Sequence, residues 1–185
     1  MMESALIIIW GLLLALTISA ASWDWYFRRI PNWLTVPGLL CGIIVHTVLK
    51  GWHGTLFSLE GAGLALILLL PFVVLRALGA GDWKLMGAVG AFLGWQLFLF
   101  VLVGSIFASG IMAAVQVYRF GRIMETLRNM WILVKGFFAF GLKQHPQISL
   151  DNPRLLKLPF GVAVAAATVV CFCAANWPFL RHALN

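Results

Sequence analysis

Long apolar runs alternate along the chain with short segments that contain most of the polar residues, which we call seams. The apolar runs predict membrane spans at about 5–21, 33–49, 57–77, 82–93, 97–118 and 159–179. A helix needs about 20 apolar residues to cross roughly 30 Å of hydrocarbon, and the run at 82–93 is shorter than that. We therefore expect one all-α polytopic domain, residues 1–185, forming a six-helix transmembrane bundle. Its short fourth helix is either packed in the centre, with the bilayer thinned locally, or has a boundary a few residues away from the predicted one.

Glycine, proline and polar residues mark the ends of these spans. Residues 50–54 predict a short external turn between the second and third spans. The apolar stretch 83–118 is too long for one span, and 94–96 is its natural break. Asn32, which follows Pro31, is predicted to be the N-cap of the second span. Tryptophans near span ends, such as Trp83, are typical of interfacial belts.

The segment 119–135 has a different pattern, with apolar residues at helical spacing on one face and mainly basic residues on the other. This pattern predicts an amphipathic helix on the inner leaflet, between the fifth and sixth spans, with its cations toward anionic headgroups. The apolar tail at 131–142 is too short to span and is either interfacial or re-entrant.

Composition and charge agree with a membrane protein. With 62% apolar residues, 10% charged residues and a mean hydropathy of +0.97, the chain is not a soluble globular domain. The net charge of +7 follows from basic residues in cytoplasmic loops, and no basic run indicates nucleic acid. Eleven cations are predicted on the cytoplasmic side, and only Lys50 and Arg181 outside. The N-terminus is then outside.

Cysteine and histidine do not predict a metal site. Cys41, Cys171 and Cys173 lie in apolar runs without a CxxC pair. His46 lies within a span and His53 in a turn, and no HExxH motif accompanies them.

The candidate chemistry lies in two aspartates, Asp24 and Asp82, at two seams on the same predicted side of the membrane. Acids beside hydrocarbon are costly and tend to be functional. Two carboxylates in one poorly solvated cavity cannot both ionise cheaply, so one keeps its proton. Such a pair works as a base that activates water and an acid that polarises a carbonyl. Gly79 and Gly81 allow a substrate strand to approach Asp82 closely.

Other interpretations stay open at this point. Asp82 can cap the fourth helix, and Asp24 can be an interfacial acid that offsets the positive charge of Arg28. Lys84 can tune Asp82 or bind substrate, or it can be a cytoplasmic-side cation only. At the level of the whole protein, the rivals are a small ion-coupled transporter or proton channel with acidic relays and a non-catalytic subunit of a secretion machine.

Two motifs carry a resemblance to a known family. Asp24 is followed, after five residues, by Ile30-Pro31-Asn32, and the later stretch is Gly79-Ala80-Gly81-Asp82-Trp83-Lys84. Pro159-Phe160-Gly161 opens the last span. The chain resembles the type IV prepilin peptidases, which are membrane aspartyl proteases with a GxGD motif.

The resemblance implies that Asp24 and Asp82 are the catalytic pair, supported by the motif residues Ile30, Pro31, Asn32, Gly79, Gly81 and Lys84. It implies cleavage of the basic leader of prepilins or pseudopilins at the cytoplasmic face of the bacterial inner membrane, without a metal or organic cofactor. The partners would be pilus or type II secretion machinery. Larger members of the family carry an N-terminal cytoplasmic insertion with paired CxxC motifs, and they also N-methylate the cleaved product. Here only residues 23–31 separate the first two spans, so the chain resembles the short peptidase-only type of Flp/Tad pili.

Overall fold

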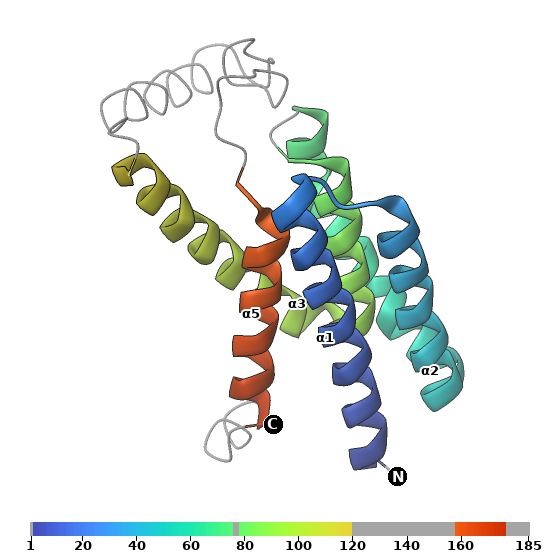
Figure 1. Ribbon diagram of the computed structural model, residues 1–185. Helices are drawn as coiled ribbons and strands as arrows, with labels where there is room; N and C mark the ends of the chain where they lie inside the picture. Colours follow the sequence, from blue (N-terminus) through green and yellow to red (C-terminus); the bar gives the residue numbers. More distant parts are fainter. Residues whose placement is uncertain (1, 76–77, 120–157, 177–185) are drawn as a thin grey trace.

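The computed structural model describes residues 2–75, 78–119 and 158–176, and every element in these ranges is a helix (Figure 1). The elements are α1 (Met2–Phe27), α2 (Asn32–Val74), α3 (Ala80–Arg119) and α5 (Phe160–Asn176). Helices α1, α2 and α3 are each long and apolar enough to cross a membrane, and α5 is a shorter apolar helix. The prediction of an all-α polytopic membrane protein is therefore supported.

The two longest helices each bend at one glycine. Gly51 in α2 has φ 58° and Gly94 in α3 has φ 69°, a backbone region that only glycine enters at little cost. Each bend divides its helix into two arms, 32–50 and 52–74 in α2, and 80–93 and 95–119 in α3. The break predicted at 94–96 is confirmed at its first residue. The turn predicted at 50–54 is narrower, since only Gly51 leaves helical geometry.

The first arm of α3 lies at the centre of the bundle. All residues from Leu85 to Gly94 are buried, as the first of the two alternatives for this short segment expects. The arm also begins at Ala80, two residues before its predicted start, as the second expects. It crosses the second arm of α2 at Gly61 and Gly90, where a Cβ on either glycine would overlap the carbonyl oxygen of the other. Small residues allow the two backbones to approach this closely.

Buried polar side chains connect the same arms. Ser58 Oγ donates to the carbonyl of Ala91 at 2.7 Å and to that of Gly42 at 3.3 Å. His46 Nε2 lies 2.9 Å from the carbonyl oxygen of Phe92, and its ring packs on Phe57 at 5.0 Å between centroids. His46 is 3% exposed and therefore acts in packing. These bonds hold the two arms of α2 side by side against α3.

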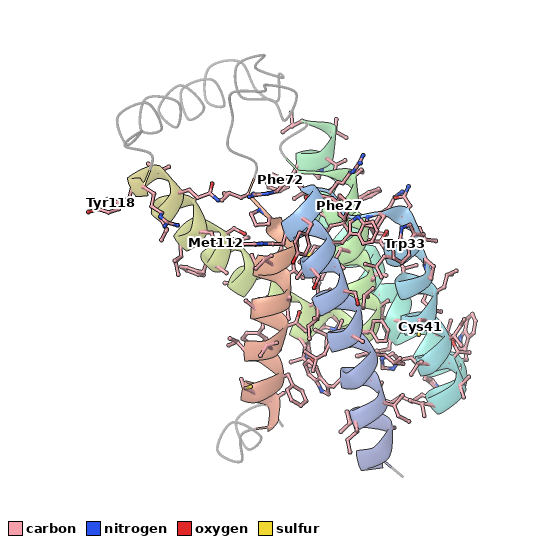
Figure 2. The ribbon with its side chains drawn as sticks, in the orientation of Figure 1. Phe27, Trp33, Cys41, Phe72, Met112 and Tyr118 are labelled. Carbon is pink, nitrogen blue, oxygen red and sulfur yellow. The ribbon has the colours of Figure 1, made fainter. Side chains whose placement is uncertain are left out.

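Helix α1 ends, and helices α2, α3 and α5 begin, at the same end of the bundle (Figure 1). We call this end the site end. The start of α1 and the end of α5 lie toward the opposite end. Exposed aromatic side chains mark the site end, as Figure 2 shows for Phe27, Phe72 and Tyr118. Trp52 and Trp95, also exposed, follow the two glycine bends at the other end. Such aromatic belts are typical of the two membrane interfaces.

The predicted amphipathic helix at 119–135 and the apolar tail at 131–142 lie outside the described residues, apart from Arg119, which ends α3.

Candidate active site

Asp24 lies in the last turn of α1 at the site end. The sequence predicts a first span ending at 21, but α1 continues to Phe27, so Asp24 is held by helical backbone. Arg28 ends the helix with φ 54°, and its backbone N–H donates to the Asp24 carbonyl at 2.9 Å. The Asp24 side chain points into the bundle, because the residue is only 4% exposed.

Gly161, the second residue of α5, binds Asp24 directly. Its backbone N–H donates to Asp24 Oδ2 at 2.8 Å, which uses one of the N–H groups that have no partner within the first turn of a helix. A Cβ at Gly161 would lie 3.1 Å from both Asp24 Cβ and Ile30 Cδ1. The sequence motif at 159–161 was a signal for this contact, but the residues alone did not place Gly161 in the site.

Asp82 is the third residue of α3, and its carboxylate folds back on the residue before that helix. The backbone N–H of Gly79 donates to it, and a Cβ at Gly79 would lie only 2.7 Å from Asp82 Oδ2. This is the return half of a capping box, in which the third helical residue satisfies the N–H of the N-cap residue. Asp82 therefore caps α3, as one interpretation of the sequence expected. The contact also sets the direction of its carboxylate.

Ile30 connects the two aspartate seams. It is 7% exposed, and its carbonyl oxygen would lie 2.5 Å from a Cβ at Gly81. The same side chain touches Gly161, which binds Asp24. The charges of Asp24 and Asp82 interact with each other. The structure thus brings both predicted acids into one neighbourhood at the site end, between α1, α3 and the start of α5.

Lys84 and Asn32 make a second connection between the seams. Lys84 Nζ donates to Asn32 Oδ1 at 2.9 Å, across 52 residues of sequence. The prediction that Asn32 is an N-cap is wrong: Pro31 is the cap residue, without a side-chain cap bond, and Asn32 is the first residue of α2. The Asn32 amide faces Lys84 because the first arms of α2 and α3 both start at this end.

Trp83 fixes the Asp82 segment to the core. Its indole Nε1 donates to the Leu66 carbonyl at 2.8 Å, and the side chain is partly buried against the core cluster. The Trp83 ring therefore packs between α3 and the second arm of α2.

Within 2–75, 78–119 and 158–176, no group of three or more His, Cys, Asp or Glu side chains is arranged to hold a metal ion. The groups that the described site presents are two carboxylates and the backbone N–H groups that bind them. A pair of this kind can exchange protons with water and with a carbonyl group.

Comparison with protein families matches residues 11–114 to the family described as the type IV leader peptidase family. The matched range includes both aspartates and the motif residues at 30–32 and 79–84, whereas Gly161 lies outside it. Comparison with curated proteins and with solved structures gives no significant match.

Proposed function

The chain belongs to the type IV leader peptidase family, and we propose that it cleaves the basic leader of Flp/Tad-like prepilins with Asp24 and Asp82 as the catalytic pair. The family itself implies a protease that acts on prepilins. The observation that carries the finer proposal is the placement of the two carboxylates in one neighbourhood at the site end, where Ile30 lies against both Gly81, next to Asp82, and Gly161, which binds Asp24.

In the proposed reaction, the two carboxylates share one proton. The ionised member takes a proton from a water molecule, whose oxygen attacks the scissile carbonyl carbon, while the protonated member donates to the carbonyl oxygen. Collapse of the tetrahedral intermediate breaks the C–N bond: the protonated carboxyl gives its proton to the leaving amine, and the ionised carboxylate takes a proton from one hydroxyl of the intermediate as the new carboxyl group forms. The hydrogen bonds that the backbone N–H groups of Gly161 and Gly79 donate to Asp24 and Asp82 hold both side chains in place for these proton transfers.

We further propose six spans, formed by α1, the two arms of α2, the two arms of α3, and α5. The described cations support an orientation with the site end in the cytoplasm. Four of them lie at that end, and Lys50 lies at the other; the four are Arg28, Arg29, Lys84 and Arg119. An excess of Lys and Arg marks the cytoplasmic side, so the N-terminus lies outside.

The rival function of a transporter or proton channel is not favoured by the helix positions. Relay acids lie near the middle of the bilayer, whereas Asp24 lies in the last turn of α1 and Asp82 in the first turn of α3. Only residues 28–31 lie between α1 and α2. This linker leaves no room for the CxxC insertion of the methylating members, which supports a peptidase without that second activity.

The proposed function predicts that the purified protein in lipid vesicles releases the leader of a co-reconstituted Flp-type prepilin by a single cut, detected by mass spectrometry of both products. An intact prepilin, together with proton flux across the same vesicles, would instead support the transporter.

The hydrogen bond between Lys84 and Asn32 predicts a smaller effect on cleavage. Lys84→Met and Asn32→Ala are each expected to lower kcat by about two- to tenfold, since an exposed hydrogen bond contributes roughly 1 kcal/mol to the placement of the Asp82 segment. Because the two side chains act through one bond, the double variant is expected to be no slower than the single variants. Lys50→Met, at the other end of the bundle, is the matched control. If the fold-losses in kcat of the two single variants multiplied in the double variant, the two residues would act separately.

A further inference from the structure

Ile30 lies between the two aspartate seams, in the short linker that connects α1 to α2. It is 7% exposed, and its Cδ1 atom packs on Gly161, where an added Cβ would lie 3.1 Å from it. On the other side, the Ile30 carbonyl oxygen and Cβ would lie 2.5 Å and 3.1 Å from a Cβ at Gly81. The residue therefore fills the space between the start of α5, which binds Asp24, and the start of α3, which carries Asp82.

The linker that holds Ile30 has little freedom to move, since it consists only of residues 28–31. At its start, the backbone N–H of Arg28 donates to the Asp24 carbonyl at 2.9 Å. At its end, the Pro31 carbonyl accepts two N–H groups from the first turn of α2, at 3.2 and 3.3 Å. A proline restricts its own φ and the conformation of the residue before it, and here that residue is Ile30. The Ile30 backbone is therefore held in place against the start of α3.

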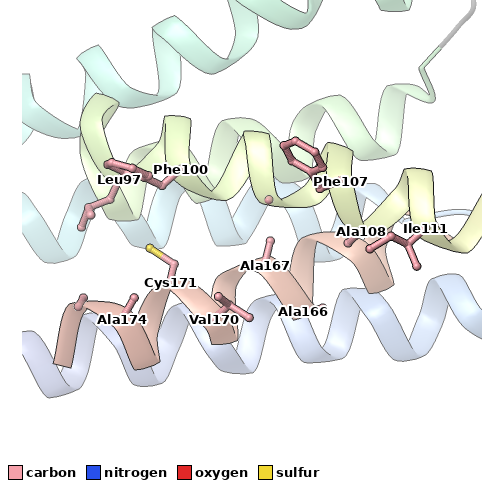
Figure 3. Close-up of a pocket in the computed structure, with 12 residues that line it drawn as sticks. Leu97, Phe100, Phe107, Ala108, Ile111, Ala166, Ala167, Val170, Cys171 and Ala174 are labelled. Carbon is pink, nitrogen blue, oxygen red and sulfur yellow. The ribbon is translucent and has the colours of Figure 1, made fainter. Parts of the chain in front are cut away.

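Helix α5 is also held from another side. It packs on the second arm of α3, where a Cβ at Gly104 would lie 3.1 Å from Ala167 Cβ. Figure 3 shows Ala167 on the side of α5 that faces this arm. Because α5 is packed between this arm and Ile30, the volume of the Ile30 side chain determines how closely Gly161 approaches the start of α3.

We propose that Ile30 is a positioning residue that sets the separation of the Asp24 and Asp82 carboxylates, as a spacer between the two helix starts that hold them. The proposal rests on the proposed function, in which both carboxylates act on one water molecule and one carbonyl group. Each carboxylate must then lie within hydrogen-bond distance of the reacting atoms, and an error of about 1 Å can cost roughly 10²-fold in rate. Ile30 takes no part in the proton transfers and acts through its contacts with Gly161 and Gly81.

Ile30→Val removes only Cδ1, the atom that packs on Gly161, and keeps the branched shape of the side chain. The start of α5 is expected to settle toward α3, so that kcat per folded protein falls about three- to tenfold while KM for prepilin is unchanged. Ile9→Val is the matched control, because Ile9 is 6% exposed in the same core cluster but lies near the other end of α1. It should lose similar stability and keep a normal kcat. Equal kcat values for the two folded variants would overturn the proposal.

A compensating pair of substitutions tests the same contact from the side of α5. Gly161→Ala adds a methyl group 3.1 Å from both Asp24 Cβ and Ile30 Cδ1, and it is expected to lower kcat about 30-fold. With Ile30→Val added, the space left by Cδ1 accepts part of this methyl group, so the double variant should be at least about threefold faster than Gly161→Ala alone. Gly104→Ala brings a Cβ to the same distance from a neighbour away from the site and should cleave normally. Losses that multiply in the double variant would overturn the proposal.

The separation itself can be measured without cleavage. In a protein whose three native cysteines are replaced by serine, the pair Asp24→Cys, Asp82→Cys is treated with thiol-reactive cross-linkers whose length increases by one methylene group at a time. The linker length that joins the two introduced thiols best is expected to be shorter with Ile30→Val, shorter still with Ile30→Ala, and unchanged with Ile9→Ala. An unchanged length in both Ile30 variants would overturn the proposal. If the unmodified protein cleaved no prepilin, the proposed function would fail, while the linker lengths would still decide whether Ile30 sets the separation.

Discussion

Asp24→Asn and Asp82→Asn are each expected to abolish leader cleavage, lowering kcat by about 10³-fold or more. Asparagine keeps the shape of the side chain, and its carbonyl oxygen can still accept the N–H bonds from Gly161 and Gly79. It cannot take a proton from water or deliver one to the substrate. Since the two carboxylates act on one water and one carbonyl, the loss of either disables the pair, and the double variant should be no slower than the singles.

The measurement is leader release from prepilin in vesicles, with thermal unfolding in detergent to show that each variant remains folded. Glu60→Gln is the matched control, because Glu60 is an exposed acid on the second arm of α2, away from the site. Near-normal cleavage by a folded Asp82→Asn protein would remove Asp82 from the catalytic pair.

Gly61→Leu is expected to destabilise the bundle by at least about 3 kcal/mol, at or beyond the usual range for overpacking. A Cβ at Gly61 would overlap the Gly90 carbonyl oxygen and lie 2.8 Å from Gly94 Cα. These are backbone atoms of the central arm, so no side-chain rotation relieves the clash. The two arms would have to separate, and the buried bonds of Ser58 to Gly42 and Ala91 would be strained with them.

Gly63→Leu provides the comparison, two residues along the same arm. A Cβ there meets nothing within 4 Å, and leucine is a better helix former than glycine by about 1 kcal/mol, so this variant should be as stable as the parent or slightly more stable. Equilibrium unfolding in mixed micelles measures the free energies of unfolding of both variants. Equal stability of the two variants would show that the Gly61–Gly90 crossing does not determine the packing of the arms.

The helical segments and their breaks were predictable from the sequence because the bilayer restricts the possible structures. A chain in hydrocarbon must satisfy its backbone hydrogen bonds internally, so apolar runs become helices whose length is limited by the membrane. The interruption at Gly94 was visible as a glycine beside polar residues in an overlong apolar run. The predicted placement of Asp24 and Asp82 at one end of the bundle followed from the same pattern and from the distribution of cations. Helix ends were less accurate, because α1 continues past the predicted boundary to include Asp24.

Which segments touch one another was decided only by the tertiary structure. The bond from Gly161 to Asp24 joins residues 137 apart in sequence, and the bond from Lys84 gives Asn32 a partner in place of the expected cap role. The bond from Trp83 to the Leu66 carbonyl likewise joins two helices. Hydropathy cannot specify such neighbours, because every span is about equally apolar and lipid tails are as apolar as the spans. Close approach at small residues, such as Gly61 on Gly90 and Gly104 on Ala167, determines which helices pack together, and that fit depends on both surfaces at once.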